Sequence, residues 1–126
     1  MGNHDLLSIT QPDLIGSIHR EYLEAGADII TTNTFRANAI SMDSYGLADQ
    51  VYTINRNAAW LACSVRDRIE QTDTGWPRFV AGALSAPNSK AEAYAEQIRG
   101  LLDGGIDLLL VETVFDTRHG IAALDA

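Results

Sequence analysis

Apolar side chains recur at helical spacing near the start of the chain. A helix should open near Pro12, with Thr10 as a possible N-cap, and Gly26 lies where its carboxyl end should stop. The apolar stripe of this helix consists of Leu14, Ile15, Ile18, Tyr22 and Leu23. The pattern therefore predicts an amphipathic helix ahead of Gly26.

Strands and further helices follow in alternation. The apolar pattern predicts strands over residues 28–34, 79–84 and 108–112, and helices over about 47–70, over 91–103 and from Thr117 onward. Residues 35–46 are expected to form a loop and a short helix, whereas 72–77 and 85–89 are polar connections. This alternation is typical of an α/β fold with a parallel sheet.

An internal similarity makes the prediction more specific. The segment from Leu23 to Ile30 resembles the segment from Leu102 to Leu109 at constant offset, and the same register places Asn33 opposite Glu112. Chance similarity among α/β sequences is the alternative. A repeated unit favours a barrel over a single Rossmann-type crossover. We therefore predict a partial (β/α)8 TIM barrel of about three parallel strands, which forms one domain over residues 1–126.

Composition and charge exclude several classes of function. The chain of 126 residues has a formal net charge of −8, so it lacks the surplus of Lys and Arg that binding to nucleic acid or to an anionic membrane needs. Cys63 is the single cysteine, which excludes an intrachain disulfide and fits a reducing, cytoplasmic location. We also see no signal peptide and no apolar run long enough to span a bilayer.

The candidate chemistry lies where the predicted strands end, because parallel α/β folds carry their reactive groups at the carboxyl ends of the strands. Glu112 follows an apolar strand, so its carboxylate should be partly desolvated and needs a cation, hydrogen-bond donors or a proton. A substrate ammonium and a neighbouring Arg or Lys are equally good partners on this evidence. Asn33 could bind a carboxylate or an amine, although a turn residue that bonds local backbone is the simpler interpretation.

The other reactive side chains indicate structural roles. His4, His19 and His119 have no metal-ligand spacing, and His19 is expected to be a packed or surface residue of the first helix. Cys63 falls in the middle of a helix and is expected to be a buried thiol. The sequence thus offers no catalytic residue and no metal ligand of its own.

Five segments match the pattern of one known family. They are Gly2–Pro12 (family N-D-L-L-x-L-T-Q-P), Ile18–Tyr22 (I-H-x-x-Y), Ala25–Phe35 (A-G-A-D-I-I-x-T-N-T-F), Val80–Leu84 (V-A-G-x-L) and Asp107–Thr117 (D-L-I-L-I-E-T-V-F-D-T). Together they resemble the homocysteine S-methyltransferases, and most closely the N-terminal homocysteine-binding domain of cobalamin-dependent methionine synthase (5-methyltetrahydrofolate–homocysteine methyltransferase). They run through nearly the whole chain in the family's order.

The resemblance implies a (β/α)8 barrel that binds homocysteine at the carboxyl ends of its strands. In the complete family, a zinc ion held by three cysteines would bind the substrate thiol as thiolate before a methyl group, supplied through cobalamin or folate, is transferred to sulfur. By motif, Glu112 would contact the homocysteine amino group, and Asn33 and Thr34 would line the same mouth.

The chain also departs from the family pattern. The family's opening strand has no counterpart before Gly2, and Cys63 matches none of the zinc cysteines. We expect this chain, with about family strands two to four, to be inactive alone, and a non-catalytic α/β binding or assembly module is the alternative. An unrelated barrel enzyme of aldolase or isomerase type is disfavoured, because Lys90 is the only lysine and follows a loop. A partial barrel exposes two sheet edges, so a homo-oligomer joined through these edges is also expected.

Overall fold

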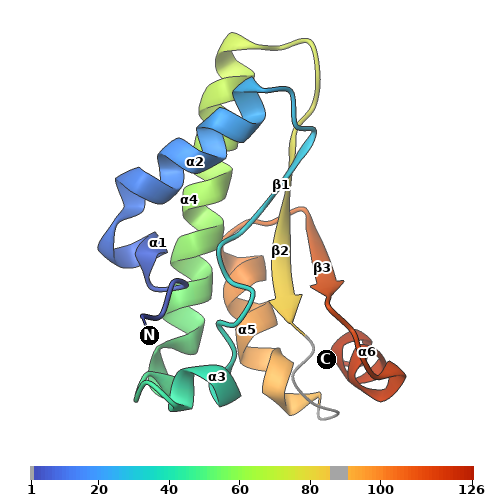
Figure 1. The fold of residues 1–126 in the computed structure, drawn as a ribbon. Helices are drawn as coiled ribbons and strands as arrows, with labels where there is room; N and C mark the ends of the chain where they lie inside the picture. Colours follow the sequence, from blue (N-terminus) through green and yellow to red (C-terminus); the bar gives the residue numbers. More distant parts are fainter. Residues whose placement is uncertain (1, 86–90) are drawn as a thin grey trace.

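A computed structural model describes residues 2–85 and 91–126 and confirms the predicted parallel sheet (Figure 1). The strands β1 (Ile29–Thr31), β2 (Phe79–Ser85) and β3 (Leu108–Glu112) lie in the order β1-β2-β3, and both pairs are parallel. Consecutive parallel strands joined by helices are the arrangement of a partial barrel. The register pairs Ile30 with Val80 and Gly82 with Leu109, which brings the carboxyl ends of all three strands to one edge.

The helices agree with the predicted ones in place, but several boundaries differ. The helical elements are α1 (Leu7–Thr10), α2 (Pro12–Glu24), α3 (Ala39–Asp43), the 3-10 turn η1 (Ala48–Gln50), α4 (Val51–Thr72), α5 (Glu92–Asp103) and α6 (Thr117–Leu124). The predicted N-cap role of Thr10 is wrong: Thr10 ends α1, and its hydroxyl donates to the Leu6 carbonyl 3.1 Å away. Gln11 takes the N-cap position of α2, with Pro12 as the first helical residue.

The first strand is shorter than predicted because side chains take over the pairing beyond Thr31. The Thr32 N–H still donates to the Ala81 carbonyl at 2.9 Å. Farther along, the hydroxyl of Thr32 accepts from the Ala83 N–H at 3.0 Å, and the hydroxyl of Thr34 donates to the Ala83 carbonyl at 2.9 Å. The chain after β1 thus stays attached to β2 without regular strand geometry.

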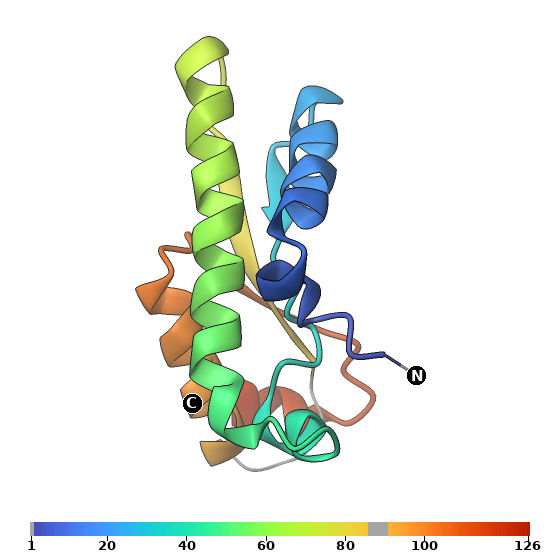
Figure 2. The same ribbon diagram turned by 90° about the vertical axis from the view of Figure 1, so that its left-hand side faces the viewer.

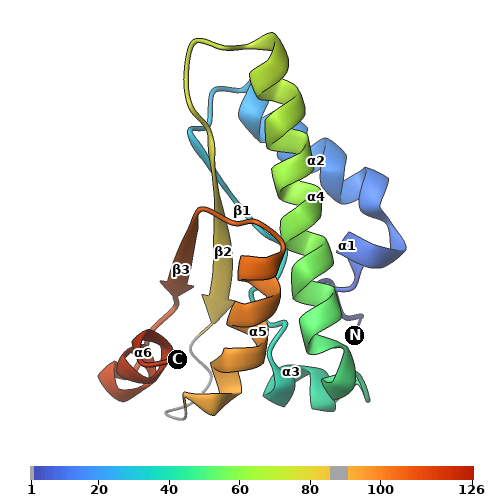
Figure 3. The same ribbon diagram turned by 180° about the vertical axis from the view of Figure 1, so that it is seen from behind.

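Helices α4 and α5 pack against each other and lie across one face of the sheet, as seen from behind in Figure 3. Helix α2 lies beside α4, toward the β1 end of the sheet (Figure 2). The core between these helices and the sheet contains Leu23, Ile30 and Val80 near β1, and Leu84, Tyr94 and Leu101 near β3. Burial of such side chains stabilises the fold by roughly 1.5–3 kcal/mol each.

Two glycines lie in close contact with neighbouring elements: Gly104 where α5 ends against α4, and Gly82 in β2 beside Ile106. A Cβ on Gly104 would lie 2.4 Å from the Ala59 Cβ and 2.7 Å from the Arg56 carbonyl oxygen. A Cβ on Gly82 would lie 2.7 Å from the Ile106 Cδ1. Gly104 therefore needs a residue without a side chain, whereas at Gly82 the Ile106 side chain can move aside. Among the described residues, no helix is long and apolar enough to cross a membrane.

Candidate functional site at the carboxyl ends of the strands

Glu112 is the last residue of β3 and pairs with Ser85 at the end of β2. It is partly exposed, and its carboxylate forms no hydrogen bond or ion pair with any residue that the structure describes. A carboxylate held at the end of an apolar strand without a protein partner can accept hydrogen bonds from a ligand ammonium.

Asn33 follows β1 and lies at the same edge of the sheet, with the end of β2 between it and Glu112. Its amide Nδ2 donates to the His4 carbonyl at 2.8 Å and approaches the Ser8 hydroxyl at 3.4 Å. These bonds fasten the N-terminal segment to the sheet. They leave the amide oxygen of Asn33 without a partner among the described residues.

Thr34 is fully buried, and its hydroxyl is engaged within the protein. Besides the bond to the Ala83 carbonyl, it lies 2.6 Å from the Thr32 hydroxyl. Gln97 of α5 donates its amide to the Thr34 carbonyl at 2.7 Å, which ties this segment to the helix layer. Thr34 therefore fixes the position of the chain beside Asn33, because its hydroxyl is hydrogen-bonded to β2.

Thr113 has a feature that the sequence pattern did not reveal. Its φ angle is 60°, in the left-handed region, directly after Glu112. A β-branched residue rarely adopts this conformation, which costs roughly 1–2 kcal/mol relative to the right-handed one. Only a glycine or asparagine at this position would have signalled the turn. The chain then passes the exposed Phe115 and reaches Asp116, whose carboxylate accepts from the Arg118 N–H and caps α6.

The capping residue Asp116 is also held by charge. The Arg118 guanidinium donates to its carboxylate, and these bonds hold the pKa of Asp116 well below its usual range. At the opposite end of the sheet, Asp107 accepts from the Val80 N–H at 2.7 Å and pairs with Arg66. These bonds give the aspartate just before β3 a structural role.

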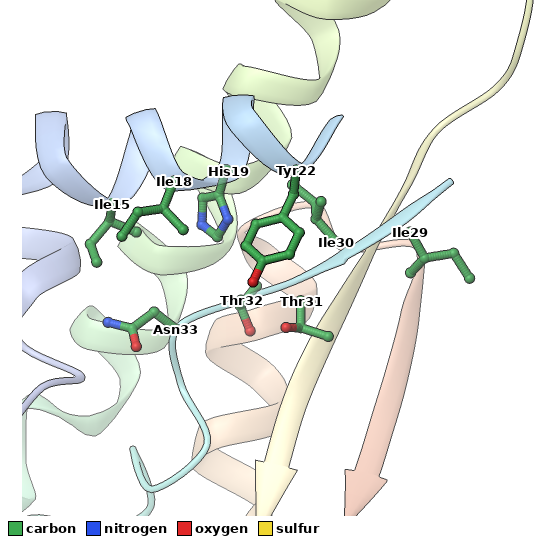
Figure 4. Close-up of a pocket in the computed structure, with 9 residues that line it drawn as sticks. All are labelled: Ile15, Ile18, His19, Tyr22, Ile29, Ile30, Thr31, Thr32 and Asn33. Carbon is green, nitrogen blue, oxygen red and sulfur yellow. The ribbon is translucent and has the colours of Figure 1, made fainter. Parts of the chain in front are cut away.

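A groove of about 420 Å³ lies between α2 and β1. Figure 4 shows Ile18, His19 and Tyr22 extending from α2 toward Thr31 and Thr32. His19 is only 6% exposed, as expected of a packed histidine, and its Nε2 has no hydrogen-bond partner among the described residues. Burial lowers the pKa of this imidazole below its ordinary value. The groove thus combines apolar walls with one unsatisfied nitrogen.

The zinc site that the resemblance implies does not fit the residues present. Cys63 is buried in α4, and its thiol donates to the Gly105 carbonyl at 3.2 Å. Burial raises the pKa of this thiol to about 11, whereas a zinc ligand must be a thiolate. No group of three His, Cys, Asp or Glu side chains in the described part of the chain could hold a metal ion.

Comparison with solved structures shows the same fold in three structures of one bacterial enzyme. The metallated form of the homocysteine methyltransferase MmuM from Escherichia coli superimposes with a TM-score of 0.81 at 24% identity, over 94% of this chain and 48% of that one. The oxidized form gives 0.80 at 22% identity with the same coverage, and the apo form gives 0.75 at 22% over 98% of this chain. The chain spans about half the length of these structures.

The family model described as homocysteine S-methyltransferase matches residues 1–126, the whole length of the sequence. This match agrees with the three-stranded parallel sheet and with the polar residues at the carboxyl ends of its strands. The chain belongs to the homocysteine S-methyltransferase family.

Proposed function

We propose that this chain forms the homocysteine-binding part of a homocysteine S-methyltransferase, nearest in type to the N-terminal domain of methionine synthase. The observation that carries the proposal is the position of Glu112: at the carboxyl end of β3, with a carboxylate that binds no described residue. The amino group of homocysteine supplies the missing cation. The family match over residues 1–126 supports homocysteine as the ligand.

Asn33 and Thr34 complete the proposed site from the neighbouring strand end. Asn33 follows β1 at this edge of the sheet, and its amide oxygen has no partner among the described residues. Thr34 holds the backbone beside Asn33 through its bond to the Ala83 carbonyl at 2.9 Å, so it acts by position. Binding needs only these groups, whereas methyl transfer needs a thiolate that this chain does not generate. A cobalamin or folate donor would belong to the complete protein.

The test is calorimetric titration of L-homocysteine into the whole chain and into two variants. Glu112→Gln removes the charge and should weaken binding at least tenfold, because a hydrogen bond to a charged group contributes roughly 1.5–3 kcal/mol. Glu24→Gln, at the exposed end of α2, is the matched control and should leave the affinity unchanged. Equal affinities for the three proteins would refute the assignment of Glu112.

A non-catalytic binding or assembly module is the second candidate, favoured by the exposed third strand. Leu108, Leu109 and Leu110 are 36–39% exposed, although each lies in a sheet strand. Uncovered apolar strands pair readily with other chains. We propose self-association through the sheet edges in the cytoplasm, where the unpaired Cys63 stays reduced. Sedimentation of a stable monomer at micromolar concentration would exclude it.

A further inference from the structure

Two buried amide side chains of the helix layer, Gln97 in α5 and Asn55 in α4, bind the chain that follows β1. The Nε2 of Gln97 donates to the Thr34 carbonyl at 2.7 Å. The Nδ2 of Asn55 donates to the Ala37 carbonyl at 2.7 Å. Both side chains are fully buried. Residues 34–37, which we call the clamped segment, are therefore held at both ends by helices.

The clamped segment connects Asn33 to the end of β2. It follows Asn33 directly, and its Phe35 carbonyl accepts from the Ser85 N–H at 2.9 Å. Ser85 is the residue that pairs with Glu112 in the register of β2 and β3. The position of the clamped segment therefore determines where Asn33 lies relative to Ser85 and, through the register, relative to Glu112.

Stability alone does not explain either amide. The Oε1 of Gln97 and the Oδ1 of Asn55 are buried and have no hydrogen-bond partner among the described residues. A buried acceptor without a partner costs free energy, which offsets what the donated hydrogen bond contributes. An apolar side chain of similar size would fill the same space without this cost. Such a side chain lacks the donor that holds the carbonyl, so the contribution of the amide is geometric.

We propose that Gln97 is a positioning residue for the homocysteine-binding edge and acts through Asn33. Its amide holds the carbonyl of the residue next to Asn33. The same Thr34 carbonyl accepts from the Ala37 N–H at 3.0 Å, so Gln97 also holds the turn that follows. The identity of the ligand rests on the function proposed above, whereas the positioning role rests on these hydrogen bonds.

Amide hydrogen exchange of the whole chain, followed by NMR, tests the position without a ligand. The reference is the Thr32 N–H, which donates to the Ala81 carbonyl ahead of the clamped segment. Gln97→Met keeps the length of the side chain but lacks the donor, so exchange of the Ala37 N–H should accelerate roughly tenfold relative to this reference. Ile98→Ala, in the core of the same helix, removes no hydrogen bond and should leave the ratio unchanged. An unchanged ratio in Gln97→Met would refute the positioning role.

Calorimetric titration of L-homocysteine connects this position to binding. Gln97→Met should weaken binding by roughly threefold to tenfold, the effect of losing one neutral hydrogen bond. In an Asn33→Ala background, the same substitution should have no further effect, because Gln97 then has no Asn33 amide to position. Ile98→Ala should leave the affinity unchanged. Additive effects of Gln97→Met and Asn33→Ala would refute action through Asn33.

The two proposals fail by different measurements. Absence of homocysteine binding by the unmodified chain would refute the proposed function, and the exchange ratio would still decide whether Gln97 holds the clamped segment. Normal binding by Gln97→Met would refute the positioning role alone. Circular dichroism verifies that each variant is folded before either measurement.

Discussion

Ser85 stands opposite Glu112 in the parallel register, and this pair is the last one between β2 and β3. The pairs before it join small or apolar residues, from Ala81 with Leu108 to Leu84 with Val111. The polar boundary of the sheet is therefore sharp and falls at the same level on both strands. In the register of β1, Asn33 falls at the level of Ala83, two residues before Ser85, and the Phe35 carbonyl accepts from the Ser85 N–H. One edge of the sheet gathers the groups that can bind a ligand.

Thr113→Gly should stabilise the protein. The left-handed φ of 60° costs threonine about 1–2 kcal/mol, and glycine avoids this cost but loses more entropy on folding. We expect a net gain of about 0.5–1 kcal/mol in the free energy of unfolding, measured by urea denaturation. Thr117→Gly, at the first position of α6, is the control and should destabilise the protein. A loss of stability in Thr113→Gly would show that the backbone at Thr113 is not strained.

Gly104→Ala should destabilise the contact between α5 and α4. The new methyl group would meet the Ala59 Cβ at 2.4 Å and the Arg56 carbonyl oxygen at 2.7 Å, and neither is the end of a flexible side chain. Overpacking of this kind costs about 1–3 kcal/mol, which should appear as a lower urea midpoint. Gly75→Ala is the matched control, since its nearest neighbour would be the Asp73 Oδ1 at 3.6 Å. Equal midpoints for the two variants would show that the helices can separate at no cost.

The stability of the protein should fall as the pH drops below about 6.5, the ordinary pKa of histidine. Burial lowers the pKa of His19 in the folded state, so in this range the unfolded chain binds a proton that the folded chain does not. The contribution of His19 to the free energy of unfolding is complete above its pKa in the unfolded chain, and it is lost as the pH falls toward its lower pKa in the folded chain. Denaturation midpoints between pH 5 and 8 should show a smaller slope in His19→Gln than in the exposed control His4→Gln. Parallel profiles would exclude His19 as the cause.

The isolated chain should transfer no methyl group to homocysteine and should retain no stoichiometric zinc after dialysis. A single buried thiol with a raised pKa cannot replace several thiolate ligands. Without a metal, the substrate thiol keeps a pKa near 8.5, and only a few per cent is thiolate at neutral pH. Zinc analysis and an assay for methionine formation check both statements. Stoichiometric zinc together with turnover that depends on Glu112 would contradict them.

The sheet and the main helices could be predicted because their apolar patterns are regular. The strand ending at Glu112 is wholly apolar before that residue, and the stripe from Leu14 to Leu23 has clear helical spacing. The family resemblance identified the fold, and the parallel order β1-β2-β3 agrees with it. The N-cap prediction at Thr10 was wrong. A threonine that caps the next helix and one whose hydroxyl bonds to the preceding turn cannot be distinguished by sequence alone.

The hydrogen bond from Gln97 to the Thr34 carbonyl and the strain at Thr113 could not be predicted. Gln97 and Thr34 lie 63 positions apart in the sequence, and only the packing of α5 beside the chain after β1 brings them together. Thr113 adopts a conformation that its residue type disfavours, so local propensity indicates the opposite of what the fold imposes. Both features arise from tertiary contacts, which the order of residue types does not encode locally.

The position of α2 decides how copies of this chain can meet. Figure 4 shows α2 extending over the outer side of β1, with Ile18 and Tyr22 directed toward that strand. We expect this helix to hinder the addition of a second copy at β1, because that copy would carry its own α2 beside the same strand. At the other edge of the sheet, the β3 leucines Leu108, Leu109 and Leu110 are exposed, so no helix that the structure describes covers them. For the self-association proposed above, we therefore expect the β3 edge to be the one used, and pairing through a single edge gives closed pairs rather than open chains.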